Sequence, residues 1–213
     1  MALARMPGAA EVPEVELVKM RRRHLRRVLA IEARVYPRPW SASLFLSELA
    51  QKSSRSYLVA RHEGDVVGYA GMMFTGLEAH ITNIAVDPDY HGRKVGSRLM
   101  MRLLTEAIAR GAKTLSLEVR VSNLPAQAMY GKFGFSVVGV RKGYYIETKE
   151  DALVMVVDDA TTNEYRLRLQ TLRDELDGIA GGAAGGSRRV GPAGRGGTGR
   201  LGGTSGMGER DHE

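Results

Sequence analysis

The segment from Ala85 to Ser97 places glycine and basic residues before a helix, and such a segment could bind an anion. The first N–H groups of a helix have no partner within it, and the helix dipole adds partial positive charge there. Gly92 lets the main chain approach a phosphate, and Arg93 and Lys94 add charge, so a pyrophosphate would suit this turn. Alternatively, the glycines serve only a tight turn, because the spacing matches neither a Walker loop nor a dinucleotide fingerprint.

The helix that presents this turn is the clearest in the chain. Apolar residues recur at helical spacing from Gly96 to Arg110, and Gly111 follows as a C-terminal cap. Strands are expected on either side, over His80–Val86 and Thr114–Val119. The other expected elements are a strand at Val15–Val18, a helix at His24–Tyr36, a helix capped by Ser41, strands at Tyr57–Ala60 and Val66–Met73 around a turn at 63–65, a short helix from Asn123 through Lys132, and a final pair at Phe135–Val140 and Ala152–Val157.

This order of elements indicates an α/β domain in which helices flank a mixed, mostly antiparallel sheet. We expect residues 1–14 to be a flexible N-terminus, residues 15–158 to form the domain, and residues 159–177 to form a C-terminal helix with helical spacing over Asn163–Leu176. In residues 178–213, glycine makes up 14 of 36 positions. Such a tract buries too little apolar surface to offset its ordering entropy, so we expect it to be disordered.

Composition narrows the classes of protein. The absence of cysteine excludes disulfides and thiolate metal sites, and we predict no metal. No stretch approaches the roughly 20 apolar residues of a membrane span, and the N-terminus does not read as a signal peptide, so we expect a cytoplasmic monomer. The net charge is +7, with basic residues grouped in Lys19–Arg27 and in the tail after Gly185. These groups could contact RNA or the ribosome, or they could be a solvated helix face and a solubilising tail.

The segment Ile81–Met101 resembles the acetyl-CoA motif of the GNAT superfamily of N-acetyltransferases, whose pattern is Gln/Arg-x-x-Gly-x-Gly/Ala. Here Gly96 matches, whereas His91 stands at the Gln/Arg position and Lys94 at the first glycine. Other stretches, in the right order across residues 15–158, resemble N-terminal acetyltransferases, especially the bacterial RimI type. These stretches are Ala30–Glu32, Tyr36–Ser41, Leu117–Asn123, Gly134–Phe135, Arg141–Tyr145 and Glu150–Met155.

The resemblance implies the GNAT fold, acetyl-CoA as co-substrate, and direct attack of an amine on the thioester. A base must take a proton from the amine, and an acid must protonate the departing thiolate. Glu118 matches the family's proposed base and Tyr130 its proposed acid. The alternatives are an exposed Glu118 carboxylate paired with Arg120, and a core tyrosine at position 130.

The resemblance also implies binding residues. The main chain of Ile84–Val86 should pair with the pantetheine like an added strand, and Asn123 should contact the coenzyme arm. Aromatic residues should wall the pocket for the first residues of the substrate, although ordinary loop packing would also explain them. The expected coenzyme residues are Ile84, Ala85, Val86, His91, Gly92, Arg93, Lys94, Val95, Gly96, Ser97 and Asn123. The expected substrate residues are Tyr36, Pro37, Trp40, Tyr144 and Tyr145.

For a RimI-type protein the implied acceptor is the N-terminal alanine of a small-subunit ribosomal protein. An enzyme of the same fold that acetylates lysines or small amines is one alternative. A protein that binds RNA or the ribosome through its basic segments is another, although Gly194–Gly197 is a single Arg-Gly-Gly element and not an array.

Overall fold

The computed structural model describes residues 14–178, and the predictions for residues 1–13 and 179–213 lie outside that range. Its strands are β1 (Glu16–Lys19), β2 (Arg55–His62), β3 (Asp65–Thr75), β4 (Glu78–Val86), β5 (Thr114–Arg120), β6 (Ser136–Tyr145) and β7 (Glu150–Val157). Its helices are α1 (Leu25–Val35), α2 (Ala42–Ala50), α3 (Val95–Ala109), α4 (Leu124–Lys132) and α5 (Asn163–Leu176), with 3-10 turns at Arg22–His24 and Pro88–Tyr90.

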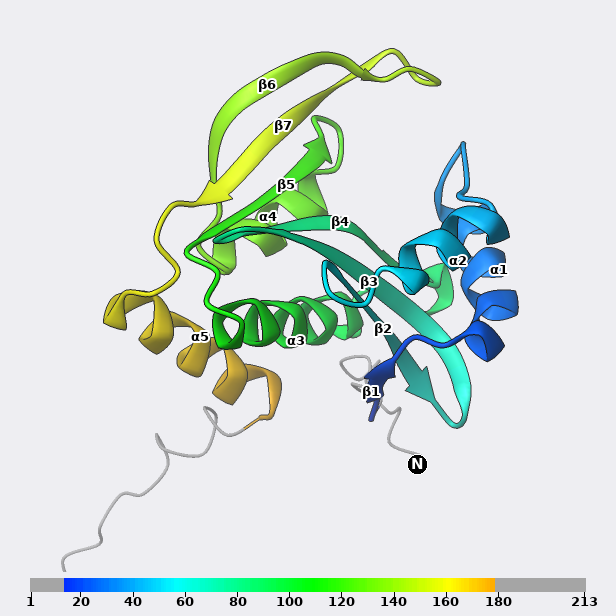
Figure 1. Ribbon diagram of the computed structural model, residues 1–213, viewed down its shortest axis with the longest axis horizontal. Helices are drawn as coiled ribbons and strands as arrows, with labels where there is room; N and C mark the ends of the chain where they lie inside the picture. The colour runs from blue at the N-terminus through cyan, green and yellow to red at the C-terminus, as the bar shows by residue number, and fades with distance from the viewer. Residues whose placement is uncertain (1–13, 179–213) are drawn as a thin grey trace, which may run out of the picture. The chain divides into compact units, whose positions relative to one another are not determined.

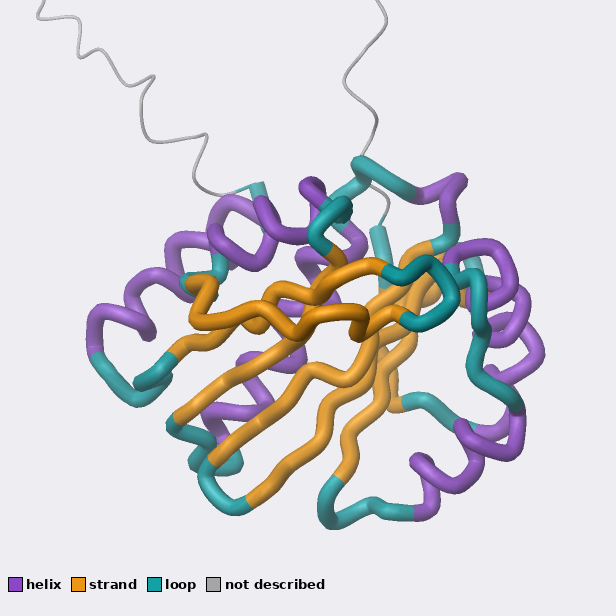
Figure 2. The backbone as a smooth tube through the Cα atoms, turned by 90° about the horizontal axis from the view of Figure 1, so that it is seen from above, coloured by secondary structure: helices purple, strands orange, loops and turns teal. Residues whose placement is uncertain are grey.

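The strands form one sheet in the order β1-β2-β3-β4-β5-β7-β6, with helices on both faces (Figures 1 and 2). Only β4 and β5 pair in parallel, and every other neighbouring pair is antiparallel. This arrangement confirms the predicted α/β class with a mixed, mostly antiparallel sheet.

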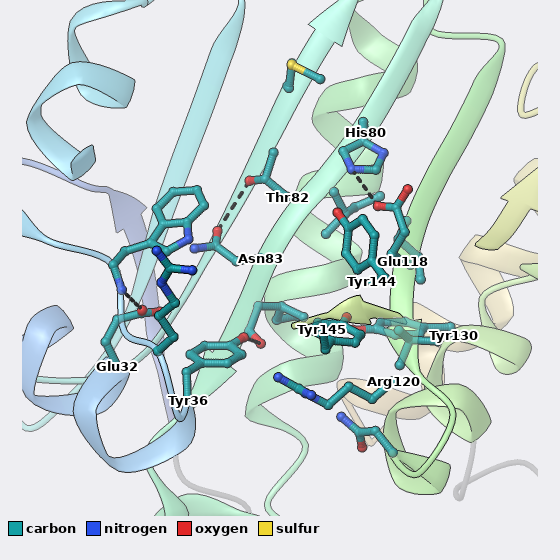
Figure 3. A pocket seen from close by; sticks show the side chains of 18 of the residues that line it. Glu32, Tyr36, His80, Thr82, Asn83, Glu118, Arg120, Tyr130, Tyr144 and Tyr145 are labelled. Atoms are coloured by element: carbon teal, nitrogen blue, oxygen red, sulfur yellow. Dashed lines mark hydrogen bonds and ion pairs between the residues drawn. The ribbon is translucent and has the colours of Figure 1, made fainter. Parts of the chain in front are cut away.

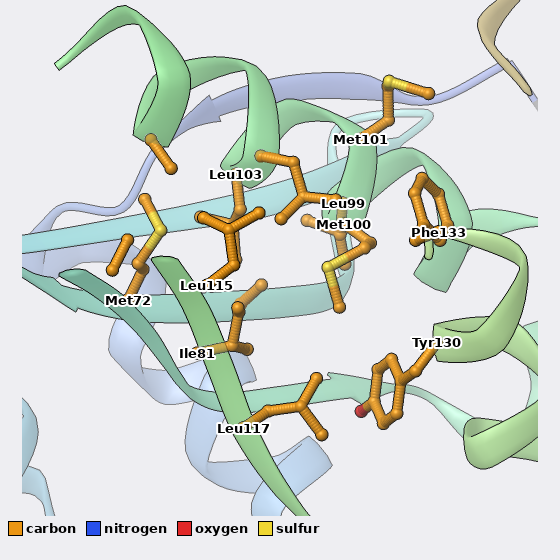
Figure 4. Close-up of a cluster of buried hydrophobic side chains, with 14 of the residues drawn as sticks. Met72, Ile81, Leu99, Met100, Met101, Leu103, Leu115, Leu117, Tyr130 and Phe133 are labelled. Atoms are coloured by element: carbon orange, nitrogen blue, oxygen red, sulfur yellow. The ribbon is translucent and has the colours of Figure 1, made fainter. Parts of the chain in front are cut away.

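Each face of the sheet carries its own core, because side chains alternate along a strand. On β2, Leu58 and Ala60 join the core under α3, while Tyr57 and Val59 join the core under α1 and α2. Figure 4 shows the first core, where Leu99 and Leu103 of α3 meet the sheet. Both faces are covered, so residues 56–60 of β2 are all buried.

Several local predictions are confirmed. The Ser41 hydroxyl accepts a hydrogen bond from the Leu44 N–H at 3.2 Å and caps α2. Gly111 has φ +84° directly after α3. The turn between β2 and β3 consists of Glu63 and Gly64, both with positive φ, which is the backbone that two-residue hairpin turns require.

The last hairpin differs from the prediction. The expected strand was to end at Val140, but β6 continues to Tyr145, and the loop covers only residues 146–149. Polar and glycine residues at 141–143 hid this continuation, because β6 is an edge strand whose side chains are largely exposed. Tyr144 and Tyr145 are therefore held at the end of a strand.

The feature that creates the site is the separation of β4 from β5. Their pairing covers only Glu78–Ile81 against Thr114–Leu117, although both strands continue past these residues. The register of β4 against β3 also skips Thr82, so β4 is irregular just where it leaves β5. None of the helices between residues 14 and 178 has the length and apolar character that a bilayer crossing requires.

Candidate active site

A pocket of about 480 Å³ opens where β4 and β5 diverge (Figure 3). Residues of β4 form one wall, residues of β5 form the other, and the loop before α2 and the end of β6 complete it. Eight predicted site residues line this pocket: Tyr36, Trp40, Ile84, Glu118, Asn123, Tyr130, Tyr144 and Tyr145. Pro37, the other predicted substrate residue, is exposed and is not among the lining residues.

Glu118 lies on β5 with only 8% of its side chain exposed. One carboxylate oxygen, Oε2, lies 3.1 Å from His80 Nε2, and the other, Oε1, lies 3.0 Å from the Arg141 guanidinium. The hydrogen bond from His80, together with the charges of His80 and Arg141, lowers the pKa of Glu118 against the opposing effect of burial. Glu118 therefore stays ionised at neutral pH and can accept a proton.

The alternative prediction, that Glu118 pairs with Arg120, is wrong. Arg120 instead reaches the β6–β7 loop, with ion pairs of 3.0 Å to Glu147 and 3.2 Å to Glu150. Its guanidinium also lies 3.7 Å from the centroid of the Tyr145 ring. Residues two apart on a strand share a face, so Glu118 and Arg120 start on the same side, but β5 ends at Arg120, where the chain turns and the side chain can reach the hairpin.

Arg120 is thus a residue whose role the sequence reasoning missed. It ties the end of β5 to the hairpin that carries Tyr144 and Tyr145, whose rings meet edge to face at 5.2 Å. Glu147 in the loop and Glu150 at the start of β7 are the signal in the sequence that could have indicated an arginine partner, since opposite charges pair across such hairpins.

Tyr130 lies on α4 and is 6% exposed. The Asn123 side chain accepts a hydrogen bond from the Ala126 N–H at 3.2 Å and so sets where α4 begins. Burial raises the pKa of the Tyr130 phenol, and the ring packs against Phe135 at 6.2 Å. The phenol is therefore protonated at neutral pH, as a proton donor must be. Both predicted descriptions apply, since Tyr130 is a core tyrosine that also lines the pocket.

The loop before α2 borders the pocket beside β4. The Tyr36 hydroxyl donates to the Ile84 carbonyl at 3.0 Å, and the Trp40 N–H donates to Glu32 Oε2 at 2.7 Å. Glu32 is 1% exposed, and burial raises its pKa to about 7 against the opposing Trp40 hydrogen bond. Glu32 anchors this loop from beneath the pocket, although the sequence had suggested only a family likeness there.

The coenzyme turn, residues 87–97, lies at the start of α3 and not in the pocket itself. Gly92 has φ +74°, and Lys94 has φ +59°, so Lys94 adopts the left-handed backbone that the family's usual glycine adopts easily. The Lys94 ammonium donates to the Glu175 carbonyl near the end of α5 at 3.4 Å. The main-chain geometry of a glycine turn is therefore present despite the lysine.

These residues fit an anionic, extended ligand. Two positions with positive φ, Gly92 and Lys94, precede α3, whose first N–H groups have no partner within the helix, and the helix dipole favours an anion there. Beyond Ile81 the β4 edge has no β5 partner, which leaves main-chain groups for an added strand. Side chains already occupy two of these carbonyls, because Tyr36 donates to Ile84 and His91 Nε2 lies 3.0 Å from Val86 O. The pairing of the pantetheine with β4 stays a prediction.

The chain belongs to the GNAT family of acetyltransferases, since the Acetyltransferase (GNAT) family model matches residues 25–135. This finding confirms the family prediction, and membership implies the use of acetyl-CoA. Among the relatives, a putative [ribosomal protein bS18]-alanine N-acetyltransferase of Bacillus subtilis is 41% identical over 145 residues, covering 68% of this chain and 94% of the relative.

The [ribosomal protein bS18]-alanine N-acetyltransferase of Escherichia coli strain K12 is 37% identical over 129 residues, covering 60% of this chain and 86% of that protein. The crystal structure of the ribosomal-protein-S18-alanine N-acetyltransferase from Escherichia coli superposes with a TM-score of 0.64 at 32% identity. That match covers 71% of this chain and 97% of the solved one. The chain is therefore a RimI-like member of its family.

Proposed function

We propose that this protein transfers the acetyl group of acetyl-CoA to the α-amine of a protein N-terminus, and that the acceptor is the N-terminal alanine of ribosomal protein bS18. The observation that carries the proposal is the pocket between β4 and β5, into which Glu118 and Tyr130 both face. The two relatives whose names state this activity match 68% and 60% of this chain. This acceptor places the reaction in the cytoplasm.

Glu118 acts as the base and Tyr130 as the acid. Acetyl-CoA supplies an acyl thioester that an amine can attack. Glu118 takes the amine proton directly or through one water, and the Tyr130 phenol gives a proton to the departing sulfur. The new bond joins the amine nitrogen to the acetyl carbon as the carbon–sulfur bond breaks.

The strength of the base favours an N-terminal amine over a lysine. His80 and Arg141 lower the pKa of Glu118, which makes it a weak base. The pKa of an α-amine is about 8 and that of a lysine is about 10.4. The α-amine therefore gives up its proton to a weak base more readily than a lysine does. A weak base is therefore sufficient only for the N-terminal acceptor.

Matched peptides test the proposal. A peptide that begins Ala-Arg and contains one internal lysine is incubated with the protein and acetyl-CoA, beside the same peptide with a blocked N-terminus. We expect mass spectrometry to find acetylation only of the free N-terminus. Acetylation of the lysine in both peptides would reject the N-terminal acceptor and favour the lysine enzyme.

A variant that lacks residues 178–213 tests the proposed domain limits and the ribosome-contact alternative. We propose that residues 15–177 suffice for catalysis, so this variant should acetylate the free peptide at the full rate. RNA binding that depends steeply on salt and disappears with the tail would assign the tail a separate contact.

A further inference from the structure

A line of hydrogen bonds connects Glu118 in the pocket to the exposed side chain of Glu78. His80 Nε2 lies 3.1 Å from Glu118 Oε2, and His80 Nδ1 lies 2.9 Å from the Ser116 hydroxyl. Ser116 in turn donates to Glu78 Oε1 at 2.6 Å. His80 and Ser116 are direct partners in the paired part of β4 and β5, so the sheet itself holds the line together.

The side chains of this line lie on the face of the sheet opposite Ile81 and Leu117, which are in the α3 core. The side chain of His80 is 23% exposed, whereas Ser116 is buried. In Figure 3, His80 points toward Glu118 beside Tyr144. The line therefore leads from the pocket, through a buried hydroxyl, to the surface.

The three hydrogen bonds of the line need one proton more than Ser116 and a neutral His80 supply. Each of the three hydrogen bonds needs one proton between its two atoms. Ser116 brings one and a neutral His80 brings one, while two carboxylates bring none. The third proton lies on the second ring nitrogen of His80, because the Ser116 hydroxyl already donates its proton to Glu78 and can only accept from Nδ1. His80 is then an imidazolium that donates to both Glu118 and Ser116.

The surroundings agree with this assignment. Arg141 lies 3.0 Å from Glu118 Oε1 and favours the carboxylate over the acid at that end. The phenols of Tyr144 and Tyr145 also face Glu118 from β6, and burial raises the pKa of both, so they remain neutral. On the other side of β4, the residue opposite His80 is Met73, which does not titrate.

We propose that His80, Ser116 and Glu78 form a proton line that keeps the charge of the pocket constant as Glu118 takes the amine proton. The inference rests on the proposed function, because it assigns Glu118 as the base. The N–H bond of the amine breaks and an O–H bond forms on Glu118. At the same time the His80 Nδ1 proton moves to Ser116, and the Ser116 hydroxyl proton moves to Glu78.

Glu78 is exposed and passes that proton to water. One proton has then entered the line and one has left it, so no uncompensated imidazolium stays beside a neutral Glu118. After the product leaves, Glu118 releases its proton to water and the line refills His80 in reverse. His80 is thus a positioning residue that acts through Glu118. Ser116 is the residue that lets His80 release its proton toward Glu78.

Variants of Ser116 test the line while the His80–Glu118 contact is retained. We expect Ser116→Ala to lower kcat roughly 10-fold with little change in KM, and Ser116→Thr, which keeps the hydroxyl, to restore it. In mixtures of H2O and D2O, kcat of the wild type should show a curved dependence from several moving protons. Ser116→Ala should make the dependence linear, which a merely structural serine would not do.

His80→Gln keeps a donor toward Glu118 but removes the imidazolium. We expect kcat to fall roughly 10- to 100-fold and its acidic limb to move to higher pH, because Glu118 loses the charge that favours its ionised form. If His80→Gln and Ser116→Ala both retain the wild-type kcat and pH profile while melting normally, the proton line is excluded.

One readout does not depend on turnover. Nitrogen NMR of the His80 ring at neutral pH should find both nitrogens protonated in the wild type and only one in Glu118→Gln. A ring that is neutral in both proteins overturns the proton line, even for a protein that acetylates no tested amine. Conversely, a doubly protonated ring in a protein without N-terminal acetyltransferase activity would reject the proposed function alone.

Discussion

The acceptor side of the site and the coenzyme turn are built in opposite ways. On the acceptor side, contacts between side chains fix the geometry. Glu118 pairs with His80 and Arg141. Arg120 pairs with Glu147 of the β6–β7 loop. At the coenzyme turn the main chain provides the geometry, through left-handed positions before α3. We therefore expect substitutions to have large effects on the acceptor side and small effects at the coenzyme turn.

Glu118→Gln should give the largest effect. The amide is nearly isosteric but cannot take a proton, so we expect kcat/KM for the peptide to fall by about 10²- to 10⁴-fold. Thioester consumption with the matched peptides measures the rate. Glu164→Gln is the control, because it makes the same change at an exposed carboxylate of α5 that does not line the pocket. Near-normal activity of Glu118→Gln would show that Glu118 is not the base.

Tyr130→Phe should follow in size. It removes only the hydroxyl from a ring that the core already packs, so the fold should be preserved. We expect kcat to decrease about 10²-fold and KM for the peptide to stay unchanged, since the lost proton donor acts only as the sulfur departs. An equal increase in KM without loss of kcat would make Tyr130 a binding residue instead.

Arg120→Met tests the clamp, by which we mean the ion pairs and ring contact that join Arg120 to the β6–β7 hairpin. Methionine keeps apolar contact with Tyr145 but loses the ion pairs to Glu147 and Glu150. We expect KM for the peptide to rise about 10-fold, because Tyr144 and Tyr145 lose a fixed position. Lys142→Met, which breaks only the exposed pair with Asp151, should leave KM unchanged.

Glu32→Gln should change the pH dependence of stability. The folded pKa of about 7 lies above that of an unfolded glutamate, so the folded protein binds more protons at intermediate pH. The free energy of unfolding should therefore fall as pH rises from about 4.5 to 7, by on the order of 2 kcal/mol. Denaturant titrations should show this slope in the wild type and a shallower one in Glu32→Gln. Identical slopes in the two proteins would contradict the raised pKa of Glu32.

Lys94→Gly should have the smallest effect and is the sharpest test of the comparison. Glycine relieves the left-handed backbone at a benefit of about 1 kcal/mol, and the contact with Glu175 is lost. We expect the dissociation constant of coenzyme A to change by less than about threefold, measured by calorimetry. A tenfold loss of affinity would show that the Lys94 charge, and not the main chain, holds the phosphates.

Sequence patterns were sufficient to predict structural features that depend on residues close together in the chain. Ser41 caps α2, Gly111 ends α3, and the α5 prediction matches Asn163–Leu176, because caps and periodicity are local properties. The family likeness depended on motifs that are contiguous in the chain, and the match to residues 25–135 confirmed it.

Only the tertiary structure decided what those residues contact. His80 and Glu118 are 38 positions apart and meet because β4 and β5 pair there in parallel. Arg120 is the arginine that lies close to Glu118 in the sequence, but its side chain turns to the hairpin, and Arg141 of β6 pairs with Glu118 instead. Nothing local encodes such meetings, since they depend on strand order and register.

The coenzyme turn, where this sequence departs from its family, shows both kinds of determination. The sequence by itself determined that a strand, a glycine turn and a helix would follow one another, because those are local preferences. Lys94 adopts a left-handed backbone, and its ammonium contacts Glu175, 81 residues later in the chain, only because α5 packs against α3. Backbone strain of this kind persists only where surrounding structure determines it, and no sequence window contains those surroundings.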